Sequence, residues 1–407
     1  MTMHRDAMDE QSTHPISKVS EGPETTETRA GATTEAGADQ EATDREIVED
    51  ERSELRSFVA ELSMPDIRSG DWFTKLLSTA LSTYTKKVDW QYFQTKYQGV
   101  PADAIVDQRI KMAARYAAIE GGLSASAYTA TVAATIGSAG GASPATVPAA
   151  VTTVMVDIAY ITRLQLHLAY DVAVLYRVPL DVSDPEDLWK LIRVAFTIKG
   201  SEVAKEGVLK TVPVVVRPLV KKFFSGSVLT SAKALPVVGK FLLQRNVIKI
   251  GIPLVGVPLA VLLNRYSTQV AGRHARAAFR NEARIIEMAE RLSERSMHPQ
   301  LMLWVVWLVM CSDGRTTDDE ALLMRHLVRL VRERHEVVDE QLAQLVEVDP
   351  ADVWHRVDAE SGDLSDVLEA AKAVAIIDGG TRSSEREMLS ELESRLGATD
   401  DGAGGGR

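Results

Sequence analysis

The chain has 407 residues, a net charge of −11 at pH 7 and 45% hydrophobic residues, enough for two or three domains with substantial cores. A single cysteine, Cys311, excludes an internal disulfide and fits a reducing compartment. The first residues contain no apolar run of the kind found in secretory signals, so we expect a cytoplasmic protein.

The charge is unevenly distributed along the chain. Residues 1–50 carry 13 acidic and 4 basic side chains, residues 101–295 carry 15 acidic and 24 basic ones, and residues 296–407 carry 23 acidic and 11 basic ones. A basic middle between two acidic ends says more about binding partners than about fold. It also predicts a salt-sensitive contact between the middle and the C-terminal part.

The N-terminal third is predicted to be a tail followed by helices. Residues 1–48 are rich in Glu, Thr, Ala and Gly and poor in large apolar residues, which predicts a disordered acidic tail. Helical spacing begins near Glu49, and one long amphipathic helix is expected over 71–97. A further helix is expected from Pro101, a favourable first-turn residue, to Gly121–Gly122, which is a stop signal.

Residues 121–156 contain no charged side chain. Their number would allow a membrane span, but Ala, Gly, Ser and Thr dominate the segment, and Pro144 and Pro148 interrupt it. We therefore expect two closely packed helices, joined near residues 140–148, that are buried or touch a membrane, with a true span as the alternative. Gly137 and Gly141 form a small-xxx-small pair that would allow close backbone approach.

Two more helices are expected before the basic region. The first covers 151–178 and contains His167, which we interpret as a core or surface residue. The second begins at Pro185, with Ser183 or Asp184 as the N-cap. Asp157 and Asp171 lie in apolar sequence without obvious partners, which leaves a hydrolase site in this part as an alternative.

Residues 207–281 contain 12 Lys or Arg and no Asp or Glu. Apolar runs broken by Gly and Pro separate these cations, a pattern that suits an anionic membrane surface. Nucleic acid is less favoured because few aromatic residues accompany the charges, and packed helices whose cations reach solvent are a further alternative. Residues 250–264 are too few for a bilayer crossing and favour a buried or re-entrant helix. The candidate lipid or phosphate contacts are Lys210, Arg217, Lys221, Lys222, Lys233, Lys240, Arg245 and Lys249.

Several segments between about 100 and 290 resemble the EcsC family of bacterial proteins. The Gly-Gly-Leu that opens the uncharged segment fits the family, and five residues match its closing segment: Pro253, Gly256, Asn264, Ala275 and Phe279. The chain departs from the family at Tyr176–Arg177, where Tyr-Gly is usual. The resemblance implies a helical domain, placed here over 49–295, and a role close to a membrane.

The C-terminal part contains a repeat. CSDGRTTDDE at 311–320 and IIDGGTRSSE at 376–385 share Asp, Gly, Thr and Glu at a spacing of 65 residues. The uncharged stretch 296–312 predicts a buried helix before the first copy. Each copy predicts a helix, an Asp-Gly turn and a second helix, so we expect a duplicated helical domain over 296–398 and a flexible tail over 399–407.

This repeat resembles the tellurite-resistance TerB family, which implies a compact all-helical domain and a stress-related role. The resemblance also implies a metal centre formed by Asp313, Glu320, Asp378 and Glu385, with Asp318 and Asp319 as supplements. Carboxylates of this number suit Ca²⁺. The alternative is helix capping, in which Thr317 and Glu320 form a capping box and Ser383 or Ser384 caps the second helix.

The sequence contains no phosphate-binding Gly loop, nucleophile elbow, zinc motif or cysteine cluster, and we interpret His326 and His335 as surface residues. We therefore expect an all-α, non-enzymatic, membrane-associated adaptor or sensor at the inner face of the cell membrane. Its basic domain would contact anionic lipid or a membrane protein, and its acidic domain a divalent cation or a partner protein. A nucleic-acid-associated protein and a hydrolase are the alternatives.

Overall fold

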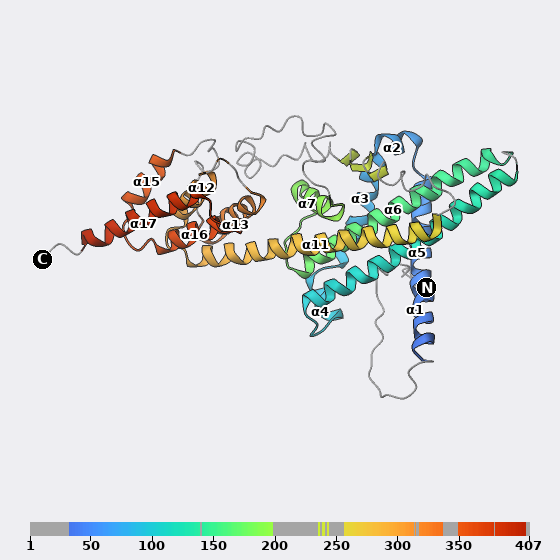
Figure 1. The fold of residues 1–407 in the computed structure, drawn as a ribbon, viewed down its shortest axis with the longest axis horizontal. Coiled ribbons are helices and arrows are strands. Elements are labelled where there is room, and N and C mark those ends of the chain that lie inside the picture. Colours follow the sequence, from blue (N-terminus) through green and yellow to red (C-terminus); the bar gives the residue numbers. More distant parts are fainter. Residues whose placement is uncertain are drawn as a thin grey trace, which may run out of the picture. The chain divides into compact units, whose positions relative to one another are not determined.

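The computed structural model describes residues 32–138, 141–197, 235–236, 238–240, 242–243, 256–312, 314, 317–336, 349–377 and 379–403. Within these ranges every regular element is a helix, which confirms the predicted all-α class (Figure 1). The chain divides into two compact units. The first unit comprises residues 1–82, 103–168 and 236–272, and the second comprises residues 83–102, 169–235 and 273–407.

Three helices begin in the first unit and end in the second. They are α3 (Asp71–Lys87), α6 (Ser143–Leu175) and α11 (Gly256–Arg295). The first unit also contains α1 (Ala32–Ala60), α2 (Met64–Ser69) and nearly all of α5 (Ala102–Gly137). The second unit adds α4 (Trp90–Lys96), α7 (Pro185–Ala195), α12 (Pro299–Cys311), α13 (Asp318–His335), α15 (Pro350–Ala359), α16 (Ser365–Ala375) and α17 (Ser383–Ala403).

Helix α1 starts well before the position expected from composition. Asp44 is 1% exposed and its Oδ2 lies 2.7 Å from Arg115 Nη1 on α5. Val48, one helical turn further on, is fully buried. The predicted disordered tail is therefore wrong for residues 32–48, because these two residues anchor the segment to the first unit despite its polar composition.

Two predicted helix boundaries differ from the structure. The helix expected over 71–97 is divided into α3 and α4, because Asp89 ends the run by accepting the backbone N–H of Tyr92 at 2.7 Å as an N-cap. The helix expected to stop at Gly121–Gly122 instead continues to Gly137. A Cβ on Gly121 would lie 2.7 Å from the carbonyl oxygen of Ala260, so this glycine permits close approach of α5 and α11 rather than a helix end.

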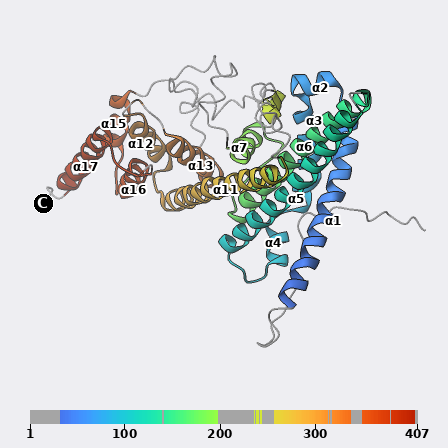
Figure 2. The same ribbon diagram turned by 45° about the vertical axis from the view of Figure 1, so that its right-hand side comes forward.

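The uncharged segment forms two packed helices, as the sequence predicts, but they end and begin at Gly137 and Ser143 rather than joining near 140–148. The second half of α5 and the first half of α6 run antiparallel and form a hairpin, which is visible in both ribbon views (Figures 1 and 2). The Oγ1 atoms of Thr135 and Thr146 lie 2.6 Å apart across the pair. Pro148 lies inside α6, where it is tolerated without ending the helix.

Local capping signals place the following helix correctly. Asp184 is the N-cap of α7, accepting the backbone N–H groups of Glu186 and Asp187 at 2.8 and 3.1 Å, and Pro185 is the first helical residue. The predicted choice between Ser183 and Asp184 is thereby settled in favour of Asp184.

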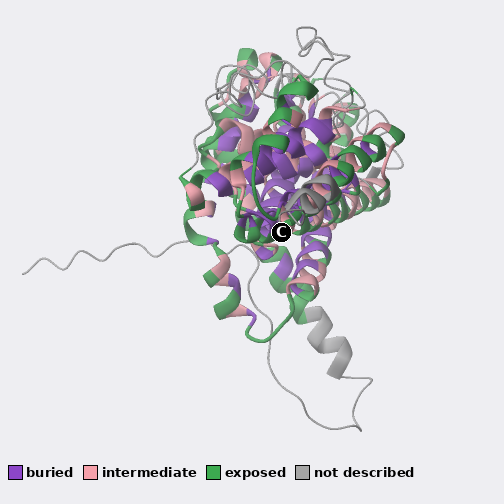
Figure 3. Ribbon diagram, turned by 90° about the vertical axis from the view of Figure 1, so that its left-hand side faces the viewer, coloured by how far each residue is buried: buried purple, intermediate pink, exposed green. Residues whose placement is uncertain are grey.

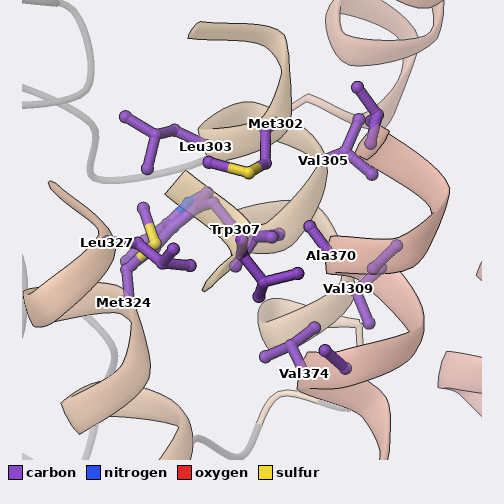
Figure 4. Packing of buried hydrophobic residues seen from close by; sticks show 14 of the residues in the cluster. Met302, Leu303, Val305, Trp307, Val309, Met324, Leu327, Ala370 and Val374 are labelled. Atoms are coloured by element: carbon purple, nitrogen blue, oxygen red, sulfur yellow. The ribbon is translucent and has the colours of Figure 1, made fainter. Parts of the chain in front are cut away.

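Helix α12 forms the centre of the C-terminal helices. Ten successive residues, Leu301–Met310, are buried, which confirms the predicted buried helix. Figure 3 shows the buried residues of the described helices in purple. It contacts α13, α15, α16 and α17. Figure 4 shows Trp307 packed among side chains of α12, α13 and α16, with labelled neighbours Met302, Leu303, Val305, Val309, Met324, Leu327, Ala370 and Val374.

Candidate functional site

The α5–α6 hairpin ends in a surface that carries neither charge nor core packing. No side chain described between residues 125 and 154 is buried, and the stretch contains no Asp, Glu, Lys or Arg. Ile136 is 74% exposed and Val151 is 39% exposed. We call residues 125–154 the hairpin tip. Exposed surfaces of soluble domains usually contain about a quarter to a third charged residues, so the composition of the tip is unusual for a surface bathed in water.

Most hydroxyls of the hairpin tip have partners within the hairpin. Seven of them lie within hydrogen-bond distance, 2.8–3.0 Å, of the backbone carbonyl oxygen four residues earlier. They belong to Ser126, Thr129, Thr131, Thr135, Thr146, Thr152 and Thr153. This back-bonding is the arrangement that allows Ser and Thr in helices surrounded by lipid.

Among the helices that the structure describes, one stretch, Pro148–Leu175 of α6, is long and apolar enough to cross a membrane, and half of its most apolar window is buried in the protein. The core helix of a soluble protein passes the same test.

The second half of α6 contains His167, which is buried and has a ring nitrogen 2.9 Å from the carbonyl oxygen of Ala80. Burial, then the charge of Arg163, lowers the pKa of His167 to about 3. It is a satisfied core histidine, as predicted.

The two carboxylates considered for a hydrolase both have partners. Asn264 donates to Asp157 at 3.0 Å, and the Tyr84 hydroxyl donates to Asp171 at 2.6 Å. Asp171 is fully buried. Asp157 belongs to the first unit and Asp171 to the second, and each is bound within its own unit. Nothing in these contacts favours catalysis at either residue.

The first unit contains a buried ion pair that the sequence analysis missed. Arg52 on α1 and Glu120 on α5 are 5% and 0% exposed, with Nε and Oε2 2.9 Å apart. Ser124 donates to Glu120 at 2.6 Å and accepts from Arg52 at 3.2 Å. Burial raises the pKa of Glu120 to about 8, Asp157 adds to the rise, and Arg52 opposes it. Complete burial keeps this carboxyl from contacting a substrate, so we interpret the pair as structural.

Of the predicted lipid contacts, only Lys240 lies among the described residues, and it is exposed. The other seven, Lys210, Arg217, Lys221, Lys222, Lys233, Arg245 and Lys249, lie outside them. The interpretation of residues 207–281 as a basic contact surface therefore stays a prediction.

The acidic repeat forms the predicted capping box in its first copy. Glu320, 1% exposed, accepts the Thr317 N–H at 2.6 Å, and Thr317 Oγ1 accepts the Glu320 N–H at 3.2 Å. In the second copy Glu385, also 1% exposed, accepts the Arg382 N–H at 2.7 Å. Since α17 begins at Ser383, Arg382 occupies the N-cap position, and the expectation that Ser383 or Ser384 caps this helix is wrong.

Arg382 joins the two copies of the repeat. Its Nη1 lies 3.9 Å from Glu320 Oε1 and 3.6 Å from Glu385 Oε1. Burial raises the pKa of Glu320, the Thr317 hydrogen bonds and Arg382 oppose the rise, and the charge of Glu385 adds to it. The guanidinium thus occupies the position between the carboxylates where a bound cation would be expected.

The predicted metal centre is only partly described. Glu320 and Glu385 are brought together, whereas Asp313 and Asp378 lie outside the described residues. Asp319 accepts from Asn281 of α11 at 2.9 Å, and Asp318 is the first residue of α13. Among the residues that the structure describes, no group of three or more His, Cys, Asp or Glu side chains is placed to hold a metal ion. The four-carboxylate centre for Ca²⁺ therefore stays a prediction.

We expect Arg382→Gln to strengthen Ca²⁺ binding by at least about tenfold, because it removes the positive charge that competes for Glu320 and Glu385. Titration calorimetry of the full-length protein with CaCl₂ measures the change. Arg386→Gln is the matched control, since Arg386 is exposed and bonds the Thr381 carbonyl instead. An equal effect of both substitutions, or none from Arg382→Gln, would contradict a cation site at these glutamates.

A pocket of about 450 Å³ lies in the second unit, between the loop that precedes α7, helix α7 and helix α13. His326 lines it and is 5% exposed, so the expectation that His326 is a surface residue is wrong. Its Nε2 lies 3.7 Å from Glu282 Oε1 on α11. His335, in contrast, is half-buried and has Nε2 2.9 Å from the Ser293 carbonyl oxygen. The sequence held no local signal for the pocket, because its residues come from segments about 140 positions apart.

Comparisons of this chain with models of known protein families, with curated protein sequences and with solved structures found no match.

Proposed function

We propose that this protein is a non-enzymatic, membrane-associated adaptor or sensor, peripheral at the inner face of the cell membrane, that docks through the α5–α6 hairpin tip. The observation that carries the proposal is the exposed, uncharged tip with seven internally bonded hydroxyls. Transfer of Ile136 and Val151 from water to lipid lowers the free energy, and the tip presents few hydrogen-bond donors that require water.

The depth of docking follows from helix length. Residues 125–137 of α5 and 143–154 of α6 each extend about 18–20 Å at 1.5 Å per residue, whereas a bilayer core is about 30 Å thick. The tip is therefore proposed to enter one leaflet without crossing. The cations of residues 207–281 would add to membrane affinity, because cations near anionic lipid contribute about 1 kcal/mol each.

The roles proposed for the two domains rest on the resemblances to the EcsC and TerB families. An EcsC-like domain would attach the protein to lipid or to a membrane protein, and a TerB-like domain would bind a divalent cation or a partner protein in a stress response. The negative charge of residues 296–407 suits both kinds of partner.

We expect Ile136→Asp/Val151→Asp to reduce vesicle binding at least about tenfold, because carboxylates placed in the lipid interface oppose insertion by about 1–3 kcal/mol. The measurement is flotation of the full-length protein with phosphatidylglycerol–phosphatidylcholine vesicles at low and high salt. Val100→Asp is the control, since Val100 is 43% exposed and lies outside the hairpin.

Binding that persists at high salt and disappears in the double variant would support docking by the tip. Binding that salt abolishes equally in all three proteins would assign it to the basic segment and contradict the role of the tip. A wild-type protein that never floats would contradict the proposed function as a whole.

A further inference from the structure

The pocket in the second unit has walls of mixed chemistry. Pro179, Leu180 and Asp181 come from the loop before α7, Asp187 and Lys190 come from α7, and Arg325, His326 and Arg329 come from α13. A volume of about 450 Å³ lies within the range of small-molecule sites. These side chains differ in how much hydrogen-bonding capacity they have left for a ligand.

The two acidic side chains of the pocket are occupied by protein donors. Asp187 accepts the Asp181 N–H at 3.0 Å and lies 3.5 Å from Lys190 Nζ and 3.4 Å from Arg325 Nη2. Asp181 accepts both the backbone N–H and the hydroxyl of Ser183, and these bonds lower its pKa. Both carboxylates are therefore already bound by donors of the protein.

The donors of helix α13 are less completely used. Arg329 Nε is buried without a hydrogen-bond partner among the described residues, and its ion pair is a 3.9 Å contact with Glu333 on the same helix. His326 Nε2 faces Glu282 Oε1 at 3.7 Å, a long contact. Arg325 makes only long contacts of 3.4 and 4.0 Å to Asp187 and Glu186. Since residues 325 and 329 are one turn apart, these donors share one face of α13.

Lys190 of α7 adds a positive charge to the pocket, paired with Glu282 and Asp187. Its Nζ lies 2.7 Å from Glu282 Oε1, which holds the ammonium beside His326. A phosphate group offers three acceptor oxygens and up to two negative charges, and a guanidinium group can bind it through two parallel hydrogen bonds (bidentate binding). The apolar side chains of Pro179 and Leu180 leave room on the other edge for an organic group.

From this distribution of used acceptors and unused donors, we propose that the pocket binds a phosphate ester of a small organic molecule. Arg329, Arg325 and His326 contact the phosphate, and Pro179 and Leu180 contact the organic part. The phosphate could belong to a soluble compound or to a lipid headgroup, because both present the same oxygens. This binding site is separate from the hairpin tip and does not depend on it.

Titration calorimetry of the full-length protein with glycerol 3-phosphate tests the soluble source, and flotation with vesicles containing phosphatidic acid tests the headgroup. Arg329→Gln is expected to weaken binding at least about tenfold, the factor given by about 1.4 kcal/mol. Arg332→Gln is the matched control, because Arg332 is exposed on the same helix and does not line the pocket. A thermal melt of each variant checks that it is folded.

Heat from glycerol 3-phosphate that Arg329→Gln removes and Arg332→Gln retains would support a soluble ligand. No heat, but flotation on phosphatidic acid that depends on Arg329, would support a lipid headgroup. Equal loss in both variants, or no binding in either assay, would overturn the proposal. The Ile136→Asp/Val151→Asp protein should keep its heat with glycerol 3-phosphate, so failure of the hairpin proposal and failure of the pocket proposal are distinguishable.

Discussion

At pH 9, replacing Arg52 by methionine is expected to lower the free energy of unfolding by about 3–5 kcal/mol, because it leaves the ionised Glu120 fully buried without its counter-charge. Urea unfolding of the full-length protein, followed by far-ultraviolet circular dichroism, measures the loss. The double variant Arg52→Met/Glu120→Met is the control. It should recover most of the stability, since two apolar side chains of similar size can replace a buried ion pair.

The same pair makes the loss depend on pH. The pKa of Glu120 is raised from 4.5 to about 8 in the folded protein, so between these values the folded state holds a proton that the unfolded state has released. Stability contributed at this site therefore falls as pH rises from about 4.5 to about 8. Without Arg52 the folded pKa is higher still, and the difference between wild type and Arg52→Met should grow from pH 5.5 to pH 9. A difference that stays constant from pH 5.5 to pH 9 would show that Glu120 keeps the same protonation state in both folded proteins over this range.

Replacing Gly121 by alanine is expected to lower the free energy of unfolding by about 2–3 kcal/mol. The new methyl group would lie 2.7 Å from the Ala260 carbonyl oxygen and 2.9 Å from its carbon, so α5 and α11 must separate. This loss exceeds the gain of up to about 1 kcal/mol that alanine brings to a helix interior.

The neighbouring glycine provides the control for this effect. A Cβ on Gly122 would meet only the end of the Val261 side chain, at 3.4 Å. Gly122→Ala should therefore be neutral or stabilising by up to about 1 kcal/mol. Thermal melts of both variants compare them directly, and equal behaviour would mean that α5 and α11 are not in close backbone contact at Gly121.

The features that the sequence predicted well depend on neighbouring residues. Asp184 and Pro185 mark the start of α7 within two positions, and Thr317 and Glu320 form their capping box within four. The run of apolar residues in α12 is too short for a membrane span and favours a buried helix. The missing charges of 121–156, together with its prolines and glycines, predict a hairpin. Each of these signals lies in one continuous stretch of sequence.

The features that were missed depend on residues far apart in the chain. From its local sequence Glu120 is expected on a helix surface, and only the contact with Arg52, 68 positions earlier, shows that it is buried. His326 has apolar and basic neighbours in sequence, and only the packing of α11 and α7 buries it beside Glu282 and Lys190. Gly121 carries the local properties of a stop signal, and the close approach of Ala260 gives it a different role. Tertiary contact decides such positions, and a single sequence does not reveal the contact.

The guanidinium of Arg382 has a consequence for how the C-terminal helices unfold. Arg382 directly precedes α17, yet it lies beside Glu320 at the start of α13. If α17 detached alone, Glu320 would lose its neighbouring positive charge. If α13 detached alone, Glu385 would keep Arg382, but the hydrophobic core would lose the side chains of Leu323 and Leu327. Partial opening is unfavourable from either side, so α13 and α17 should open cooperatively, as a single foldon.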